Sequence, residues 1–189
     1  MIILASGSPR RAELLKQIGV EFCVQPTDID ESVLADESAQ EYVLRLARQK
    51  AEAVASGPRS RVVLGSDTAV VQRGRIFGKP KNKQDFLQTL TQLSGAVHQV
   101  FSAVALVIDG RPFSRLSVTD VYFRNLQRSE LLDYWQTGEP VDKAGGYAIQ
   151  GFAATFINRI DGSYSGVMGL PLFETAELIQ SCLASDNNA

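Results

Sequence analysis

Leu4-Ala5-Ser6-Gly7-Ser8-Pro9-Arg10-Arg11 is the stretch around which the rest of this chain is organised. The apolar run that starts at Ile2 predicts a strand, and the small residues after it predict a loop. Ser8 and Pro9 predict a helix N-terminus, because proline has no backbone N–H to lose at the first helical position. The chain is therefore expected to open with a strand, a loop and a helix.

Two arginines lie in the first turn of this predicted helix. The helix dipole is already positive there, so Arg10 and Arg11 each cost about 0.3 kcal/mol or more unless an anion is present. Free amide N–H groups, the loop of Ser6, Gly7 and Ser8, and two guanidinium groups together predict a phosphate-binding site. The alternative is that both arginines pair with acidic side chains elsewhere.

Composition limits the class of protein. The 189 residues are 44% hydrophobic and 21% charged, which fits one domain or two tightly joined lobes. No run approaches the roughly 20 apolar residues that span a membrane. The first residues also lack the charged segment of a signal peptide, so we expect a cytoplasmic protein. A net charge of −2 argues against a broad nucleic-acid surface and favours a small phosphorylated ligand.

Cysteine and histidine usage predicts neither a disulfide framework nor a zinc site. Cys23 and Cys182 are isolated, and we expect both to be small core residues. The one histidine, His98, stands near the start of a predicted strand. We expect it to satisfy a local hydrogen bond, because nothing nucleophilic is spaced to use it in catalysis.

Lys50 is out of place in its predicted helix. Ser38-Ala39-Gln40-Glu41 is a capping box, and the helical period that follows to Ala55 places Leu46, Ala47 and Lys50 on one apolar face. The lysine must either extend along its stem to solvent or meet a buried anion. On the first reading, methionine at position 50 would complete the apolar face and keep or raise stability.

Asp67 follows the apolar run Val62-Val63-Leu64-Gly65, which is typical of a buried strand. A carboxylate at the end of a central strand suggests a metal ligand or a general base. The alternative is an Asx turn or a cap on the next segment. Further on, Arg73-Gly74 predicts a hairpin, and Gly78-Lys79-Pro80 predicts a stiff segment that holds Lys79 in place.

Two loops also carry candidate ligand groups. The acidic loop around Asp28, Asp30 and Glu31 either attracts a cation or is simply solvated. The glycine-rich loop 142–151 predicts a backbone that approaches a ligand, and its Gln150 has the amide donor and acceptor that base recognition requires.

The C-terminal part predicts mainly scaffolding. A strand is expected over 154–160, a flexible loop over 163–169, and a final helix from Pro171 to Leu183. The tail 185–189 is expected to be disordered.

Five motifs in order resemble the Maf family of nucleoside triphosphate pyrophosphatases. They are Leu4-Ala5-Ser6-Gly7-Ser8-Pro9-Arg10-Arg11, Gly65-Ser66-Asp67-Thr68, Gly78-Lys79-Pro80, Asp142-Lys143-Ala144-Gly145 and Gly166-Val167-Met168-Gly169-Leu170-Pro171. The resemblance covers nearly the whole chain. It implies a single Maf-like domain over 1–189, with a two-lobed α/β fold of the inosine-triphosphatase-like type, a long twisted mixed sheet flanked by helices, and an active-site cleft between the lobes.

The resemblance also implies a reaction, in which water attacks the α-phosphorus of a nucleoside triphosphate and yields the monophosphate and pyrophosphate. The implied roles are catalysis for Asp67; phosphate or substrate binding for Ser6, Ser8, Arg10, Lys50 and Lys79; specificity for Arg11, Thr68 and Gln150; and binding of Mg²⁺ or Mn²⁺ for Glu31 and Asp67. The specificity residues are similar to those of the branch that hydrolyses dTTP and UTP. A homodimer is expected by the same resemblance.

Two alternatives stay open at this point. The chain could hydrolyse 7-methyl-GTP or another modified nucleotide, or it could be a nucleotide-binding regulator of septum formation. Binding without turnover needs no activated water, so release of pyrophosphate separates the regulator from the enzyme. Neither alternative involves a nucleic acid or a membrane.

Overall fold

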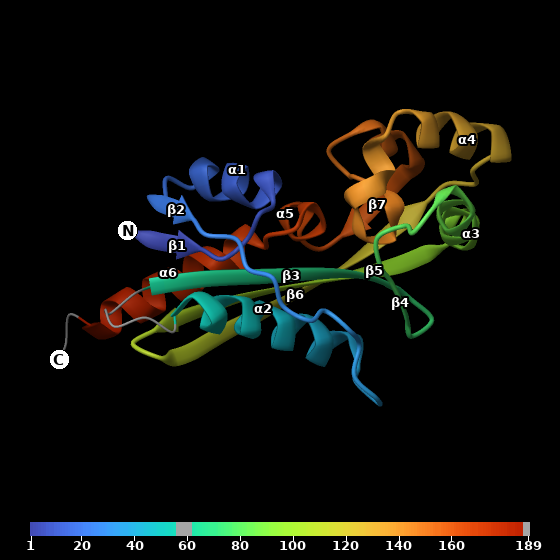
Figure 1. The fold of residues 1–189 in the computed structure, drawn as a ribbon. Helices are drawn as coiled ribbons and strands as arrows, with labels where there is room; N and C mark the ends of the chain where they lie inside the picture. The colour runs from blue at the N-terminus through green and yellow to red at the C-terminus, as the bar shows by residue number, and fades with distance from the viewer. Residues whose placement is uncertain (56–61, 187–189) are drawn as a thin grey trace.

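The computed structural model describes residues 1–55 and 62–186 and shows a mixed α/β fold. Figure 1 shows a long sheet with helices on both of its faces. The helices are α1 (Pro9–Gln17), α2 (Ala39–Ala55), α3 (Lys83–Leu93), α4 (Arg128–Gln136), α5 (Tyr164–Met168) and α6 (Leu172–Asp186). The strands are β1 (Ile2–Leu4), β2 (Phe22–Val24), β3 (Val62–Gln72), β4 (Arg75–Phe77), β5 (Val97–Ile108), β6 (Arg111–Phe123) and β7 (Ile157–Asp161). Short 3₁₀ helices are η1 (Glu139–Asp142), η2 (Ala144–Gly146) and η3 (Phe152–Phe156).

Seven described strands form one mixed sheet in the order β2-β1-β3-β5-β6-β7, with β4 paired to β3. β1 runs parallel to β2 and to β3, and the other pairs are antiparallel. The hairpin predicted at Arg73-Gly74 is confirmed, and a second two-residue turn, Asp109-Gly110, joins β5 to β6. Both residues of each turn have positive φ, which matches the twist of a two-residue hairpin.

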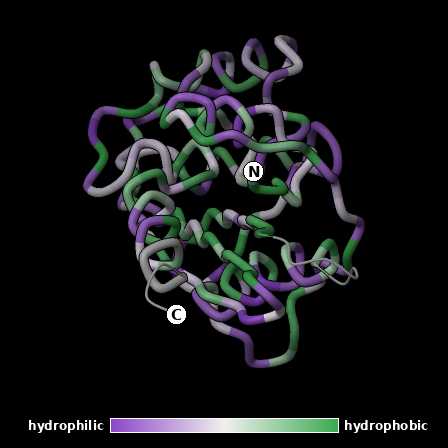
Figure 2. The backbone as a smooth tube through the Cα atoms, turned by 90° about the vertical axis from the view of Figure 1, so that its left-hand side faces the viewer, coloured by the Kyte–Doolittle hydropathy of each residue, from purple (hydrophilic) through white to green (hydrophobic). Residues whose placement is uncertain are grey.

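The sheet joins two lobes with separate cores. In the first lobe, α2 covers one face of β3 and β5, and α1 and α6 cover the other through a cluster that includes Leu15, Leu64 and Leu178. In the second lobe, α3, α4 and η3 pack around Phe86 and Phe156 over the far ends of β5 and β6. Figure 2 shows apolar and polar stretches interspersed along the backbone.

Several elements differ from the sequence-based prediction. Asp67 does not end a strand, because β3 continues through it and stays paired with β5, where Asp67 faces Ala103. The expected strand over 154–160 begins only at Ile157, after η3. The expected flexible loop over 163–169 contains α5, because the Ser163 hydroxyl caps it by accepting the Gly166 N–H.

Cys23 and the C-terminus also need correction. Cys23 is exposed, since β2 is an edge strand and the residue points to solvent, whereas Cys182 is buried as predicted. The last helix continues to Asp186, so the first two residues of the expected disordered tail are helical, and residues 187–189 lie outside the described residues. Within residues 1–55 and 62–186, the helices are too short or too polar to cross a membrane.

Candidate active site

A gap along one edge of β3 creates the site. The pairing of β1 with β3 ends at Leu64, and the pairing of β4 begins at Val70. Between these two partners, Asp67 and Thr68 point to opposite faces of the sheet but lie beside the same opening. A single cavity of about 510 Å³ therefore reaches side chains from both faces.

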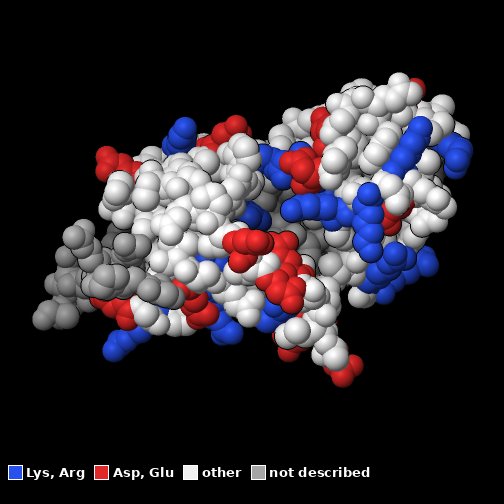
Figure 3. Space-filling view, viewed as in Figure 1, with Lys and Arg blue, Asp and Glu red and all other residues white. Residues whose placement is uncertain are grey.

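The cavity brings together every site residue predicted from the sequence. These are Ser6, Ser8, Arg10, Arg11, Glu31, Lys50, Asp67, Thr68, Lys79 and Gln150. Figure 3 shows acidic and basic side chains gathered along the hollow between the lobes. The lining also has apolar members, called the apolar wall below, which include Val100, Tyr147 and Val167. The cavity thus has a charged part and an apolar part.

The N-terminal loop reaches Asp67 because β1 is parallel to β3. Leu4 pairs with Leu64, so the chain leaves β1 beside the part of β3 that carries Asp67. The loop is ordered by the Ser6 hydroxyl, which accepts the Ser8 N–H at 3.2 Å and an N–H of Arg11 at 3.2 Å. Ser8 is the N-cap of α1 and Pro9 its first residue, as predicted, although the Ser8 side chain makes no capping bond.

Lys50 is buried and pairs with two carboxylates. Its Nζ lies 2.7 Å from Asp67 Oδ1 and 2.6 Å from Glu31 Oε1. Of the two readings of Lys50, the buried anion is therefore the correct one. Glu31 is also the member of the acidic loop that reaches the cavity, whereas Asp30 accepts the N–H of Ser32.

The two carboxylates respond differently to this environment. Burial raises the pKa of Asp67 above its usual value, although Lys50 and Arg11 oppose the rise. Burial is the largest single influence on the half-exposed Glu31 and raises its pKa, but the hydrogen bond to Lys50 and the charges of Lys50, Lys79 and Arg11 together outweigh burial, so the net pKa is lowered. The site therefore makes Asp67 a better proton acceptor than an ordinary aspartate and favours the ionised form of Glu31.

Close packing of α2 on β3 allows Lys50 to reach Asp67. Gly65 lies beneath α2, where an added Cβ would stand 2.2 Å from the Ala47 carbonyl oxygen and 2.8 Å from the Ala51 nitrogen. Real Cβ atoms do not approach backbone that closely, so only glycine permits this distance between helix and strand. Gly65, a member of the Gly65-Ser66-Asp67-Thr68 motif, therefore has a packing role next to the site.

We expect Gly65→Ala to lower the free energy of unfolding by about 1 to 3 kcal/mol, because α2 must move away from β3. Turnover should fall as well, since Lys50 moves with α2. Chemical denaturation and an activity assay measure both effects. Gly78→Ala is the control for stability, because an added Cβ there meets nothing within 4 Å. Equal stability of the two variants would contradict the packing role.

Arg11 and Thr68 hold the segment after α5. The Gly169 carbonyl accepts bonds from Arg11 Nε at 2.8 Å and from the Thr68 hydroxyl at 3.3 Å, and the Ser66 hydroxyl also donates to it. Burial lowers the pKa of Arg11, and the nearby Asp67 carboxylate opposes this change. One edge of Arg11 is therefore occupied by backbone and Ser6, although the side chain still lines the cavity.

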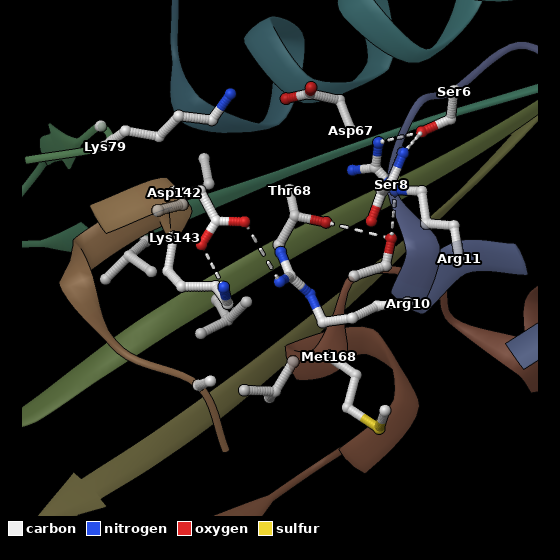
Figure 4. A pocket seen from close by; sticks show the side chains of 18 of the residues that line it. Ser6, Ser8, Arg10, Arg11, Asp67, Thr68, Lys79, Asp142, Lys143 and Met168 are labelled. Carbon is white, nitrogen blue, oxygen red and sulfur yellow. Dashed lines mark hydrogen bonds and ion pairs between the residues drawn. The ribbon is translucent and has the colours of Figure 1, made fainter. Parts of the chain in front are cut away.

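Arg10 reaches across the cleft instead. Its Nη1 lies 3.8 Å from Asp142 Oδ2, and Asp142 also pairs with the neighbouring Lys143. The other predicted cation, Lys79, extends from the segment after β4 with its ammonium end toward Asp67 in Figure 4. Asp142 and Lys143 belong to one of the five family motifs but were given no role from the sequence, although their adjacent opposite charges at the start of a glycine-rich loop were a usable signal.

The glycine-rich loop approaches protein rather than ligand at two of its glycines. An added Cβ on Gly145 would lie 2.8 Å from Val70, and one on Gly146 would lie 3.0 Å from Phe86. Both glycines therefore let the loop pack closely against side chains of the second core. Gln150 does line the cavity and is exposed in it.

His98 lies behind the apolar wall and outside the cavity lining. Its Nε2 is 2.8 Å from the Tyr147 hydroxyl, so its partner is distant in sequence rather than local as predicted. Burial lowers the pKa of His98 to about 4. A neutral, buried imidazole fits the expected structural role.

The carboxylates fit a divalent cation. Asp67 and Glu31 already direct one oxygen each at a single cationic atom, Lys50 Nζ. Mg²⁺ and Mn²⁺ are bound in such sites by one or two carboxylates, with phosphate oxygens and water as the remaining ligands. In residues 1–55 and 62–186, no group of three His, Cys, Asp or Glu side chains could hold a metal by itself.

Comparison with known proteins agrees with this architecture. The family model described as "Maf-like protein" matches residues 1–182. The chain belongs to the Maf family. A relative from Vibrio parahaemolyticus is 52% identical over 183 residues, covers 96% of this Maf chain and 97% of its own length, and is named dTTP/UTP pyrophosphatase. A relative from Saccharophagus degradans with the same name is 50% identical over 184 residues, which is 95% of this chain and 88% of its own.

The fold of this Maf protein is shared more widely. The Staphylococcus aureus Ham1 protein superimposes with a TM-score of 0.51 at 14% identity and covers 98% of both chains. The predicted fold class, inosine-triphosphatase-like with a long mixed sheet flanked by helices, is thus confirmed.

Proposed function

We propose that this Maf protein hydrolyses dTTP and UTP to the nucleoside monophosphate and pyrophosphate. The observation that carries the proposal is the cavity in which Asp67, a buried carboxylate of raised pKa, is surrounded by cationic side chains. Relatives at about half identity over nearly the whole chain support the choice of substrate.

The cations would bind the triphosphate. Arg10, Lys79 and Lys143 line the cavity from three separate segments, and a triphosphate bridging them would be held by charge-assisted bonds. Such fixed charges also stabilise the negative charge that develops on pyrophosphate as it leaves. Ser6 and Ser8 add hydroxyl groups beside the N-terminus of α1, where the dipole favours an anion.

Asp67 would act as the base. The oxygen of a water molecule forms a bond to the α-phosphorus, the bond from that phosphorus to its bridging oxygen breaks, and the water proton passes to the Asp67 carboxylate. A carboxylate of raised pKa accepts a proton more readily than an ordinary aspartate. Mg²⁺ or Mn²⁺, which Asp67 and Glu31 would hold, neutralises phosphate charge when bound.

Gln150 would read the base. Its amide can donate to O4 or O2 of a pyrimidine and accept from N3–H, a pattern that uracil and thymine share and cytosine partly reverses. The apolar wall that includes Val100 and Tyr147 would contact the rest of the base.

We expect similar kcat/KM for dTTP and UTP and a value for CTP lower by at least about 10-fold, because one lost hydrogen-bond partner costs about 1 to 3 kcal/mol. Gln150→Ala should lower the ratio of kcat/KM for UTP to that for CTP by a larger factor than it lowers kcat/KM for dTTP. Pyrophosphate release from dTTP, UTP, CTP, GTP and 7-methyl-GTP measures both. Gln136→Ala, on the exposed side of α4, is the control. A higher kcat/KM for GTP or 7-methyl-GTP than for dTTP and UTP would contradict the proposal. A ratio of UTP to CTP that Gln150→Ala leaves unchanged would contradict it as well.

The homodimer and the cytoplasmic location complete the proposal. Both rest on the family resemblance and on the sequence pattern. Light scattering of the purified chain tests the first, and cell fractionation tests the second.

A further inference from the structure

Tyr134 and Glu139 lie directly behind the loop that carries Gln150. Neither side chain is among those that line the cavity. Tyr134, at the end of α4, is fully buried, and Glu139 opens η1. The function proposed above gives neither of them a role.

The two side chains bind the backbone on both sides of Gln150. The Tyr134 hydroxyl donates to Glu139 Oε1 at 2.7 Å and accepts the Ala148 N–H at 3.3 Å. Beyond Gln150, the Phe152 N–H donates to Glu139 Oε2 at 3.0 Å and the Ala153 N–H to Oε1 at 3.5 Å. One linked pair therefore fixes the backbone two residues before Gln150 and two residues after it.

Gly151 allows this arrangement. A Cβ added there would lie 2.3 Å from Glu139 Oε2 and 2.5 Å from the carboxyl carbon. The loop can therefore close over the carboxylate only with glycine at this position. Gly151 was expected to bring backbone close to a ligand, and the group it approaches is Glu139.

Aromatic packing holds the Tyr134 hydroxyl in position. The Tyr134 ring stacks on Phe152 with centroids 5.7 Å apart and meets the edge of Phe156 at 5.1 Å. Burial, together with the bond to Glu139, raises the pKa of Tyr134, so its hydroxyl keeps the proton that it donates. The donor is therefore rigid.

We propose that Tyr134 and Glu139 are positioning residues for base selection. By binding the N–H groups of Ala148 and Phe152, they hold Gln150 at the angle from which its amide pairs with uracil or thymine and rejects cytosine. This inference rests on the proposed function. It adds two residues that would affect which pyrimidine nucleotide is hydrolysed without contacting the substrate themselves.

Tyr134→Phe and Glu139→Gln test the inference. The first keeps the buried ring and removes only the hydroxyl, and the second keeps the shape of the side chain and removes one of its two acceptor oxygens. The readout is the ratio of kcat/KM for UTP to that for CTP, measured on a single preparation. This ratio does not depend on the fraction of folded enzyme, so a loss of stability alone leaves it unchanged.

We expect each variant to lower the UTP to CTP ratio by roughly 3- to 10-fold, which is the effect of one lost hydrogen bond. Tyr122→Phe, a partly buried tyrosine of β6 outside the cavity lining, should leave the ratio unchanged. In the Gln150→Ala background, Tyr134→Phe should lower the ratio no further, because the residue through which it acts has been removed.

The outcomes separate the inference from the proposed function. A wild-type enzyme that selects UTP over CTP, with Tyr134→Phe and Glu139→Gln retaining that ratio, overturns the inference alone. An equal effect of Tyr134→Phe with and without Gln150 also overturns it, because the hydroxyl would then act by another route. A wild-type enzyme that does not distinguish UTP from CTP removes both the role of Gln150 and the inference.

Discussion

Asp67→Asn is expected to reduce pyrophosphate release from dTTP at least 100-fold, because a general base contributes roughly 10²- to 10⁴-fold to such reactions. The amide has the volume of the carboxylate but accepts no proton and carries no charge for a metal. Nucleotide affinity should change much less, since the cations that face the phosphates remain. A coupled assay for pyrophosphate and a binding titration measure the two quantities.

The same substitution should leave the thermal midpoint at pH 7 unchanged or raise it. The pKa of Asp67 is raised in the folded protein, so the ionised form is less favourable there than in the unfolded chain. The destabilisation by this charge is present above the folded pKa and disappears as the pH falls through it. The difference in thermal midpoint between Asp67→Asn and wild type should therefore become smaller as the pH falls.

Asp133→Asn is the matched control, because it removes an exposed carboxylate of α4 outside the cavity lining. The wild-type rate should also fall in acid at a pH above the usual range for aspartate. Turnover of Asp67→Asn within a few-fold of wild type would exclude Asp67 as the base.

Lys50→Met is expected to lower turnover at least 10-fold and also to destabilise the protein at neutral pH by about 3 kcal/mol. The substitution leaves Asp67 buried without its nearest cation, and breaking a buried ion pair exposes the full cost of the remaining charge. The sequence alone predicts the opposite sign for stability, because methionine completes the apolar face of α2.

The lost stability should return as the pH falls. Without Lys50 the pKa of Asp67 rises further, so protonation relieves the buried charge at a milder pH. The double variant Lys50→Met with Asp67→Asn should recover stability at pH 7 for the same reason. Arg48→Met, which removes an exposed cation from α2, is the control. Denaturation curves between pH 5 and 8 decide the sign, and a stability equal to wild type throughout would show that Lys50 extends to solvent.

Local patterns were enough for several elements, and together with the family resemblance they named the residues that line the cavity. The capping box at Ser38 and Glu41 forms as predicted, with the Glu41 carboxylate accepting the Ser38 N–H and the Ser38 hydroxyl accepting the Glu41 N–H. Ser8, Pro9 and the two hairpin turns also lie where propensity places them. These features depend on neighbours in the chain, and such short-range preferences can be seen in a sequence.

Site residues were recognisable because they break local rules. Arg10 adds positive charge to a helix N-terminus, and Lys50 interrupts an apolar face. A residue that is unfavourable where it stands needs compensation elsewhere, so the sequence indicates that a partner exists without naming it. In the structure, Lys50 is compensated by Glu31 and Asp67, and Arg10 is paired with Asp142.

Long-range pairing decided the rest. A carboxylate after an apolar run looks like the end of a strand, but pairing with β5 carries β3 through Asp67. The site then depends on where two other strands stop along the opposite edge, and no local pattern contains that information. The sequence by itself determined which side chains are unusual and which elements carry them. Only the tertiary structure decided which partner each one meets, because the contacts that bury Lys50, turn Arg11 to Gly169 and close Gly151 over Glu139 join segments far apart in the chain.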